Sequence, residues 1–460
     1  MNFASLEYIG FLFVVWITYL ILKRRGQNLL LLAASYFFYS MWDWRFHSLI
    51  LISTGVDYTI GRFLAKSEDT RSRRVALTVS LVVNLGLLGF FKYYGFFVDN
   101  AVVLLESVGF QANRPVLEVL LPVGISFYTF QTLSYTIDVY RRKMPACQSL
   151  LDFSLFVAFF PQLVAGPIER ASHLLPLIQN ERSVTGPDIS RGTFLILLGL
   201  VKKLAIADGL ARSVDAVYST TADISGLDVT LATYAFALQI LCDFSAYTDI
   251  ARGTSKLFGI DLMINFNAPY LSNNPSEFWR RWHISLSTWL RDYLYIPLGG
   301  NRKGPVRTYI NLMLTMVLGG LWHGAAWNFV LWGLYQGGLL CGFRLFDNPD
   351  RHKPPAPSPY DLPKRMRIAS RHVLFRLVTA FLFFQLVSYG WLLFRAESLS
   401  DVVRLSGELL NPVGWTELSF PRPPLAALLG VLLFVPWEAM TFFKGRATFY
   451  QSWTPFARGM

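Results

Sequence analysis

The sequence predicts an all-α protein that is embedded in a membrane. Of its 460 residues, 53% are hydrophobic and only 16% are charged, whereas a soluble domain carries roughly a quarter charged residues. Apolar runs recur along the whole chain, and many approach the ~20 residues that an α-helix needs to cross a bilayer. We therefore expect one polytopic domain over residues 1–460, with about ten to twelve transmembrane helices and further re-entrant or interfacial helices.

The apolar runs mark the predicted helices in order, some as single spans and some as shorter pieces. They are Leu6–Leu22, Leu29–Trp42, Phe46–Leu64, Val75–Phe91, Val116–Val139, Leu151–Val164, Thr193–Ala207, Leu227–Ile250, Tyr309–Phe343, Val373–Phe394 and Pro424–Phe443. The polar stretches between them are short, which leaves no room for a separate soluble domain. A proline-rich stretch from Asn348 to Lys364 is predicted to be a cytoplasmic loop, and Leu399–Arg422 is expected on the outer side.

The net charge of +12 does not indicate nucleic-acid binding, because the basic residues stand in short clusters beside the apolar runs. Such clusters are typical of cytoplasmic loops. They predict an extracytoplasmic N-terminus and a cytoplasmic C-terminus. The clusters are Lys23–Arg25, Arg71–Arg74, Arg141–Lys143, Lys364–Arg365 and Lys444–Arg446. The three cysteines are widely spaced and form neither a disulfide framework nor a metal motif, so no bound metal is predicted.

The segment Tyr309–Phe343 is too long for one crossing and has basic residues at both ends. We expect it to enter and leave the membrane on the same side, as a hairpin of two half-helices. Gly319, Gly320 and Gly324 offer a break, which would put His323 near the turn, deep in the membrane. Irregular backbone at that depth must line protein or a watery cavity, and an ionisable residue there usually has a function.

His283 lies in a second segment rich in tryptophan and arginine. If Glu277–Tyr293 forms one helix, Arg280, His283, Ser287 and Arg291 share one stripe and the aromatic residues share another. This pattern predicts either a polar face turned to a charged substrate or an interfacial anchor helix. His323 likewise has a structural alternative, as a buried histidine that bonds a carbonyl.

Common catalytic signatures are absent from the sequence. There is no GxSxG nucleophile motif, no HExxH motif and no glycine-rich phosphate loop. Histidine without a paired nucleophile suits a base that deprotonates a hydroxyl, or a proton relay in a transporter. The remaining ionisable residues in apolar runs are expected to form structural ion pairs or to snorkel. They are Asp57, Asp138, Lys202, Lys203, Asp243 and Asp249.

Several motifs together make the chain resemble the membrane-bound O-acyltransferases, within them the bacterial branch around the alginate O-acetyltransferase membrane subunit. The most specific are FWRRWHISLSTWLRDYLY (Phe278–Tyr295) and LGGLWHGAAW (Leu318–Trp327). Further motifs match in order from about residue 30 to 335. They are LPVGISFYTFQTLSYTIDVYRR (Leu121–Arg142), FFPQLVAGPIER (Phe159–Arg170), GLVKKLAIAD (Gly199–Asp208), and CDFSAYTDIARG followed by NFNAPY (Cys242–Tyr270).

The resemblance implies a ring of tilted helices around a central tunnel, and two catalytic positions, His323 and His283. It also implies no bound cofactor, a cytoplasmic acyl thioester such as acetyl-CoA as donor, and a location in the bacterial inner membrane among its lipids. The acceptor would be an exported polysaccharide such as alginate, peptidoglycan or cellulose, reached through an SGNH-type partner. Candidate substrate-binding residues are Asn274, Glu277, Arg280, Ser287, Arg291, Trp322 and Asn328.

Two other functions remain open from the sequence. A non-catalytic scaffold of a polysaccharide secretion complex would still support modification after both histidines are replaced. A transporter with a His/Asp relay would move solute in liposomes without thioester turnover.

Overall fold

A computed structural model describes residues 3–111, 117, 119–164, 166–220, 224–347, 373–411, 415 and 418–444. Within these ranges the chain is helical and contains no strand, which confirms the predicted fold class. The chain forms two compact units: Met1–Gly192 with Thr254–Leu262, and Thr193–Gly253 with Met263–Met460. The single domain expected over residues 1–460 stays a prediction.

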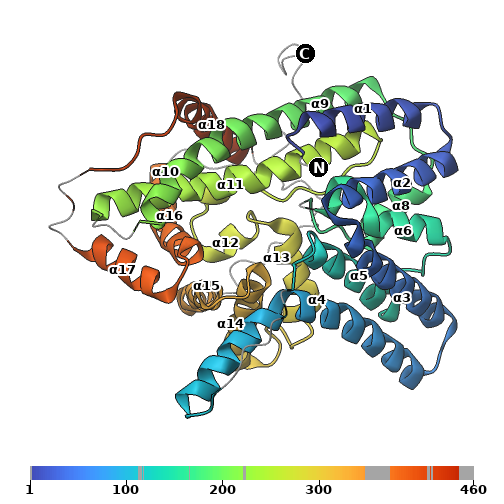
Figure 1. Cartoon of the computed structure of the whole chain (residues 1–460), viewed down its shortest axis with the longest axis horizontal. Helices are drawn as coiled ribbons and strands as arrows, with labels where there is room; N and C mark the ends of the chain where they lie inside the picture. Colours follow the sequence, from blue (N-terminus) through green and yellow to red (C-terminus); the bar gives the residue numbers. More distant parts are fainter. Residues whose placement is uncertain are drawn as a thin grey trace. The chain divides into compact units, whose positions relative to one another are not determined.

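The first unit is built from helices that mostly coincide with the predicted apolar segments (Figure 1). They are α1 (Leu6–Leu20), α2 (Arg24–Asp43), η1 (Trp44–Phe46), α3 (His47–Lys66), α4 (Thr70–Ser107), α5 (Ile125–Tyr140), α6 (Leu150–Ala158), α7 (Phe160–Leu163) and α8 (Ala171–Gln179). Side-chain oxygens of Ser5, Asp69 and Ser149 cap α1, α4 and α6 by accepting from free backbone amides of the first turn.

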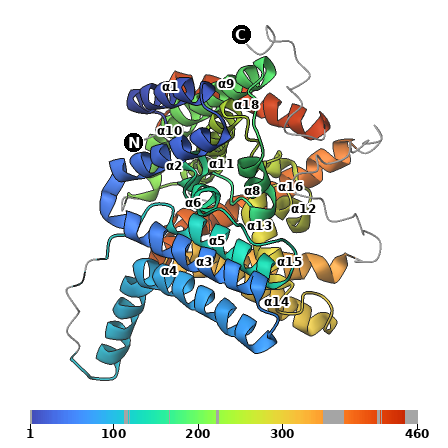
Figure 2. The same ribbon diagram turned by 90° about the vertical axis from the view of Figure 1, so that its right-hand side faces the viewer.

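Two helix boundaries in this unit differ from the sequence-based ones. Among the described residues of the predicted segment Val116–Val139, the helix starts only at Ile125, directly after Gly124, which adopts a left-handed conformation with φ +78°. In contrast, α4 continues well past Phe91 to Ser107. Figures 1 and 2 show the second half of α4 (cyan) extending away from α3 and α5.

A fully buried carboxylate, Asp57, joins three helices of the first unit. Its oxygens accept from Ser80 Oγ at 2.5 Å and Asn84 Nδ2 at 2.9 Å on α4, and from Thr136 Oγ1 at 3.1 Å on α5. Neutral donors therefore satisfy the Asp57 carboxylate. The sequence had predicted that this residue forms an ion pair or snorkels to the membrane surface. Asp57 has a structural role, since a buried polar group is tolerated when its hydrogen bonds are made.

The second unit contains the C-terminal helices and the predicted hairpin. Its elements are η2 (Val201–Ala207), α10 (Asp208–Tyr218), η3 (Pro269–Leu271), α12 (Pro275–Trp279), α13 (Ile284–Leu290), η4 (Arg291–Tyr295), α14 (Gly304–His323), α15 (Trp327–Phe346), α16 (Val373–Arg395), α17 (Leu399–Leu410) and α18 (Leu425–Lys444). Two helices, α9 (Gly186–Leu200) and α11 (Gly226–Leu257), contribute residues to both units.

The element η2 is a π-helix, and it carries two consecutive lysines into ion pairs with α11. Lys202 Nζ lies 2.7 Å from Asp249, and Lys203 Nζ lies 2.7 Å from Asp243. A wider helical turn is often found at functional positions. The expected ion pairing of these four residues is confirmed.

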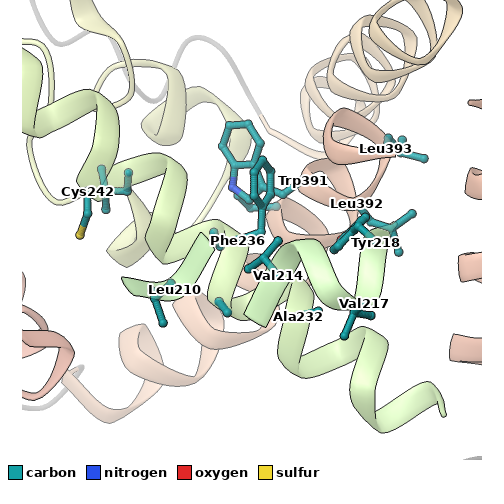
Figure 3. Packing of buried hydrophobic residues seen from close by; sticks show 14 of the residues in the cluster. Leu210, Val214, Val217, Tyr218, Ala232, Phe236, Cys242, Trp391, Leu392 and Leu393 are labelled. Atoms are coloured by element: carbon teal, nitrogen blue, oxygen red, sulfur yellow. The ribbon is translucent and has the colours of Figure 1, made fainter. Parts of the chain in front are cut away.

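The core of the second unit is an apolar cluster where α10, α11 and α16 meet. Figure 3 shows Val214 of α10 near Phe236 of α11 and Trp391 of α16. Trp391 also packs against Trp282 at 4.7 Å and Trp332 at 6.2 Å between ring centroids. The same core thus supports the segments that carry both histidines.

Five described helices are long and apolar enough to cross a membrane: α4, α11, α15, α16 and α18. Shorter apolar helices, such as α1, accompany them. The structure therefore has the composition of a multi-pass membrane protein. The proline-rich stretch from Asn348 to Lys364 and both chain ends lie outside the described residues. The polar stretch Leu399–Arg422 begins with the helix α17, and its expected place on the outer side stays a prediction.

Candidate active site

His323 is the last residue of α14, at the turn of the predicted hairpin. The two helices α14 and α15 lie side by side (Figures 1 and 2). A Cβ atom on Gly320 would collide with the carbonyl oxygen of Phe329, so glycine allows the two backbones to approach closely. The hairpin is confirmed, with the break at Gly324–Ala326.

The expectation of two half-helices is wrong. Each helix has 20 residues and is therefore about 30 Å long, the thickness of a bilayer core. Gly319 and Gly320 were expected to offer a break, but the helix continues through both. They lie inside α14.

His283 does not lie on a continuous helix, and the expected stripe of Arg280, His283, Ser287 and Arg291 is not formed. The segment Glu277–Tyr293 breaks after α12, and His283 stands at the start of α13 with φ +41° and ψ +56°. This left-handed conformation is uncommon for a residue other than glycine. It turns the histidine ring into the protein, where the residue is fully buried.

The ring of Trp322 joins the two histidines. Its centroid lies 5.9 Å from that of His283 and 5.0 Å from that of His323, both with edge-on geometry. Phe244 of α11 also packs edge-on against His283, with 4.6 Å between ring centroids. Trp332 and Phe394 each lie 5.2 Å from His323. Both imidazoles are thus oriented by aromatic rings from four separate segments.

A cavity of about 540 Å³ lies next to the His323 end of this group. Its walls include Asn328, Phe329 and Phe394, and the last of these is in ring contact with His323. Asp243 and Arg395 add charges at its edge. Its volume falls in the range of small-molecule sites. A small cavity of about 30 Å³ is lined by Asn265 and Phe266, which border His283.

Burial lowers the pKa of His283 well below its ordinary value, and the nearby His323 lowers it further. His283 is therefore neutral at physiological pH, and one of its ring nitrogens is an acceptor. Its Nδ1 lies 3.4 Å from Ser285 Oγ. Among the described residues, no group of three or more His, Cys, Asp or Glu side chains is placed to hold a metal ion.

The other candidate residues have defined contacts, and their roles in substrate binding stay predictions. Asn274 caps α12 by accepting from the Glu277 amide at 2.8 Å. Glu277 pairs with Arg281 at 3.1 Å and with Arg376 at 3.5 Å. Each of these contacts supports the α12 region, and neither residue lines the 540 Å³ cavity.

Four further candidates also have local partners. Arg280 bonds the Ser276 carbonyl at 3.1 Å, Ser287 Oγ bonds the Trp282 carbonyl at 3.0 Å, and Arg291 pairs with Asp292 at 2.8 Å. Asn328 donates to the Ala396 carbonyl at 2.8 Å and lines the large cavity. Asn328 thus shares this cavity with Phe394, which is in ring contact with His323, whereas Trp322 contacts both histidines directly.

Several residues of the site were not found from the sequence. Phe244, Trp332 and Phe394 come from distant helices, and no local pattern distinguishes them from ordinary core residues. Asn265 and Ser285 lie in the quoted motifs NFNAPY and FWRRWHIS. A buried polar residue within a specific motif was a usable signal for these two.

Known proteins are similar to most of this chain. The profile of the MBOAT, membrane-bound O-acyltransferase family matches residues 29–358. A probable alginate O-acetylase AlgI of Azotobacter vinelandii is 39% identical over 95% of this chain and 83% of its own length. The chain belongs to the membrane-bound O-acyltransferase family. It is therefore an acyltransferase, and the resemblance drawn from its motifs is confirmed.

Two other relatives extend the comparison. A probable alginate O-acetylase AlgI of Pseudomonas syringae pv. tomato is 40% identical over 94% of this chain and 79% of its own length. A peptidoglycan O-acetyltransferase of Helicobacter pylori is 34% identical over 89% of this chain and 80% of its own length. The three relatives are thus named for the O-acetylation of alginate or of peptidoglycan.

Proposed function

We propose that this membrane-bound O-acyltransferase moves an acetyl or other acyl group from a cytoplasmic thioester to hydroxyls of an extracytoplasmic polysaccharide. His323 is the general base, and His283 orients substrate or stabilises developing charge. Acetyl-CoA is the proposed donor. The protein lies in the bacterial inner membrane, with its N-terminus outside and its C-terminus in the cytoplasm.

The observation that carries this proposal is the group of His283, Trp322 and His323 beside a cavity of about 540 Å³. His323 is half-buried and His283 is fully buried. A half-buried imidazole is more accessible to an incoming hydroxyl than a fully buried one, whereas a buried neutral imidazole is suited to hold a fixed hydrogen bond.

The proposed reaction needs a base and donors for the oxyanion, and it needs no enzyme nucleophile. A thioester is already activated, so no covalent enzyme intermediate is required. The acceptor oxygen forms a bond to the thioester carbonyl carbon while His323 removes the hydroxyl proton. The carbon–sulfur bond then breaks, and the departing sulfur receives that proton as a free thiol. Donors in a low-dielectric site would stabilise the oxyanion, and Trp322, Asn328 and His283 are the candidates.

The acceptor class follows from the relatives, which are named for alginate and peptidoglycan acetylation. We propose a glycan hydroxyl of this kind, reached through an extracytoplasmic partner of the SGNH type. Membership of an enzyme family favours this proposal over the transporter and the scaffold.

The experiment uses the full chain in proteoliposomes with radiolabelled acetyl-CoA, a soluble hydroxyl acceptor and His323→Ala or His323→Gln variants. The wild type should release free thiol and acetylated acceptor, and both variants should lose at least about 100-fold in rate, as for the loss of a general base. Normal membrane insertion and monodispersity of the variants serve as the control. Wild-type turnover in either variant would refute the assignment of the base.

A second experiment tests which thioester is the acyl donor. Acetyl-CoA and an acetylated carrier protein are supplied separately at matched concentrations. Turnover with acetyl-CoA alone supports the proposed donor. Turnover only with the carrier protein would contradict it while leaving the role of His323 intact.

A further inference from the structure

We infer that Asn265 is a positioning residue that fixes the orientation of the His283 imidazole, acting together with Ser285. This inference rests on the proposed role of His283 in acyl transfer. Asn265 lies 18 residues before His283 in the chain, at the start of the motif NFNAPY, and the sequence alone does not connect it to His283. The structure brings its amide and carbonyl groups to the start of α13.

The start of α13 is not capped by the side chain of its own N-cap residue. A helix leaves its first backbone N–H groups without partners inside the helix, and the N-cap side chain usually satisfies one of them. Here the N-cap residue is His283, whose side chain makes no capping bond. Its ring is turned away into the protein, so the cap must come from elsewhere.

Asn265 caps α13 with its backbone carbonyl oxygen and its side-chain oxygen Oδ1. The Ile284 amide donates to the Asn265 carbonyl oxygen at 2.9 Å, and the Ser285 amide donates to Asn265 Oδ1 at 3.1 Å. Asn265 and Ser285 are both fully buried. Two bonds to consecutive amides directly after His283 hold the backbone in its left-handed conformation, which would otherwise be unfavourable.

The other end of the Asn265 side chain reaches the helix that packs on the histidine. Its Nδ2 lies 3.4 Å from Thr248 Oγ1, and that hydroxyl donates to the Phe244 carbonyl at 3.1 Å. The Phe244 ring is the aromatic neighbour 4.6 Å from the His283 ring. Asn265 therefore connects the backbone that carries His283 to the helix turn whose ring packs against it.

Ser285 lies next to the His283 imidazole and connects it to Asn265. Its amide is held by Asn265, and its Oγ lies 3.4 Å from His283 Nδ1. A hydroxyl at Nδ1 selects the tautomer of a neutral imidazole and so determines whether Nε2 donates or accepts. A shift of Asn265 would be passed to Ser285 and from there to the ring.

Titratable groups near the His283 segment come from several elements, among them Glu438 of α18, which lines the small cavity beside Asn265 and Phe266. The titratable group nearest to His283 on α14 is His323. On α11, Asp249 follows Thr248 and is paired with Lys202 and Arg252. In the preceding segment, Arg281 is paired with Glu277. Phe244, Phe266 and Trp322 provide the ring contacts.

The test measures kcat, donor KM and the pH profile of the full chain in proteoliposomes with acetyl-CoA and a soluble hydroxyl acceptor. Asn265→Ala removes both ends of the side chain, and we expect kcat to fall at least about tenfold with donor KM within about twofold, as for lost orientation of a catalytic group. Asn265→Asp keeps the oxygen that accepts from Ser285. It should recover most of kcat, and its negative charge should move the acidic limb of the kcat profile to higher pH.

The matched control is Asn311→Ala. Asn311 is also a fully buried asparagine in the same unit, and its Nδ2 holds the Gly300 carbonyl at 2.9 Å. The Asn311→Ala variant should lose thermal stability as Asn265→Ala does, but its kcat should stay within about twofold of the wild-type value. If Asn265→Ala keeps wild-type kcat, or if Asn265→Asp is as inactive as Asn265→Ala with no shift of the profile, the positioning role is refuted.

The His323→Ala variant separates this inference from the proposed function. An inactive His323→Ala beside a fully active Asn265→Ala would overturn the positioning role alone. A fully active His323→Ala would overturn the proposed function, whatever the Asn265 variants do.

Discussion

At the scale of single residues, the two histidines differ in backbone and in burial. His283 has left-handed backbone dihedrals and is fully buried, whereas His323 ends a regular helix and is half-buried. Both contact the ring of Trp322. A fixed, neutral imidazole and a more accessible one beside a cavity suit two different tasks in one acyl transfer.

The burial of His283 predicts a pH dependence of stability. Its pKa in the folded protein is lowered, first by burial and then by His323. The neutral form is therefore favoured by folding, so this contribution is fully present above the unfolded pKa of about 6.5 and is lost as the pH falls toward the lowered folded pKa. We expect His283→Asn, which tolerates a left-handed backbone, to lose less thermal stability than the wild type as the pH falls below about 6.5.

Melting temperatures in detergent at matched ionic strength measure this difference. Parallel curves for the wild type and His283→Asn over that range would show that His283 does not titrate with folding.

At the scale of elements, close glycine contacts hold α14 against α15. Gly320 faces the Phe329 carbonyl, and Gly333 faces the Met316 carbonyl. By contrast, a Cβ on Gly338 of α15 would meet no atom within 4 Å. This contrast within one helix pair provides a matched test.

We expect Gly320→Ala to destabilise the protein by about 1–3 kcal/mol, because the added methyl group forces the helices apart. The shift should also move His323 and lower kcat. Gly338→Ala should be neutral or stabilising by up to about 1 kcal/mol, since alanine favours the helix. Thermal unfolding and acyl-transfer assays of both variants check this, and equal effects of the two would argue against close packing at Gly320.

The π-helix η2 provides a second test between elements. Lys202 is buried and paired with Asp249, which Arg252 also contacts at 3.4 Å. Lys202→Met should cost about 2–4 kcal/mol, because it leaves a buried carboxylate with only a weaker partner. The double variant Lys202→Met/Asp249→Leu should be more stable than Lys202→Met alone. A double variant as unstable as the sum of the two single changes would show that the pair is not coupled.

At the scale of the whole molecule, the order of basic clusters predicts which connections face the cytoplasm. Lys66 ends α3 just before Arg71–Arg74, and Ser107 ends α4. With α4 crossing the membrane once, these two positions lie on opposite sides. We therefore expect Lys66 to be cytoplasmic and Ser107 to be extracytoplasmic.

A membrane-impermeant maleimide added to intact cells tests this orientation. In a background without the three native cysteines, Ser107→Cys should be labelled and Lys66→Cys should be labelled only after permeabilisation. The reverse pattern would invert the predicted topology, including the assignment of the N-terminus to the outside.

The sequence by itself determined the helical membrane class, the hairpin with His323 at its turn, and the family. Composition and the length of apolar runs reflect the demands of the bilayer directly, and the glycine and histidine motifs are local in the chain. The break before His283 could not be read from periodicity, because the helical pattern of Glu277–Tyr293 is continuous in sequence. Only the tertiary structure decided that Asn265 caps α13 and that Trp322 joins the two histidines. Those contacts depend on hydrogen bonds and ring packing between segments far apart in the chain, and these outweigh the local preference for one continuous helix.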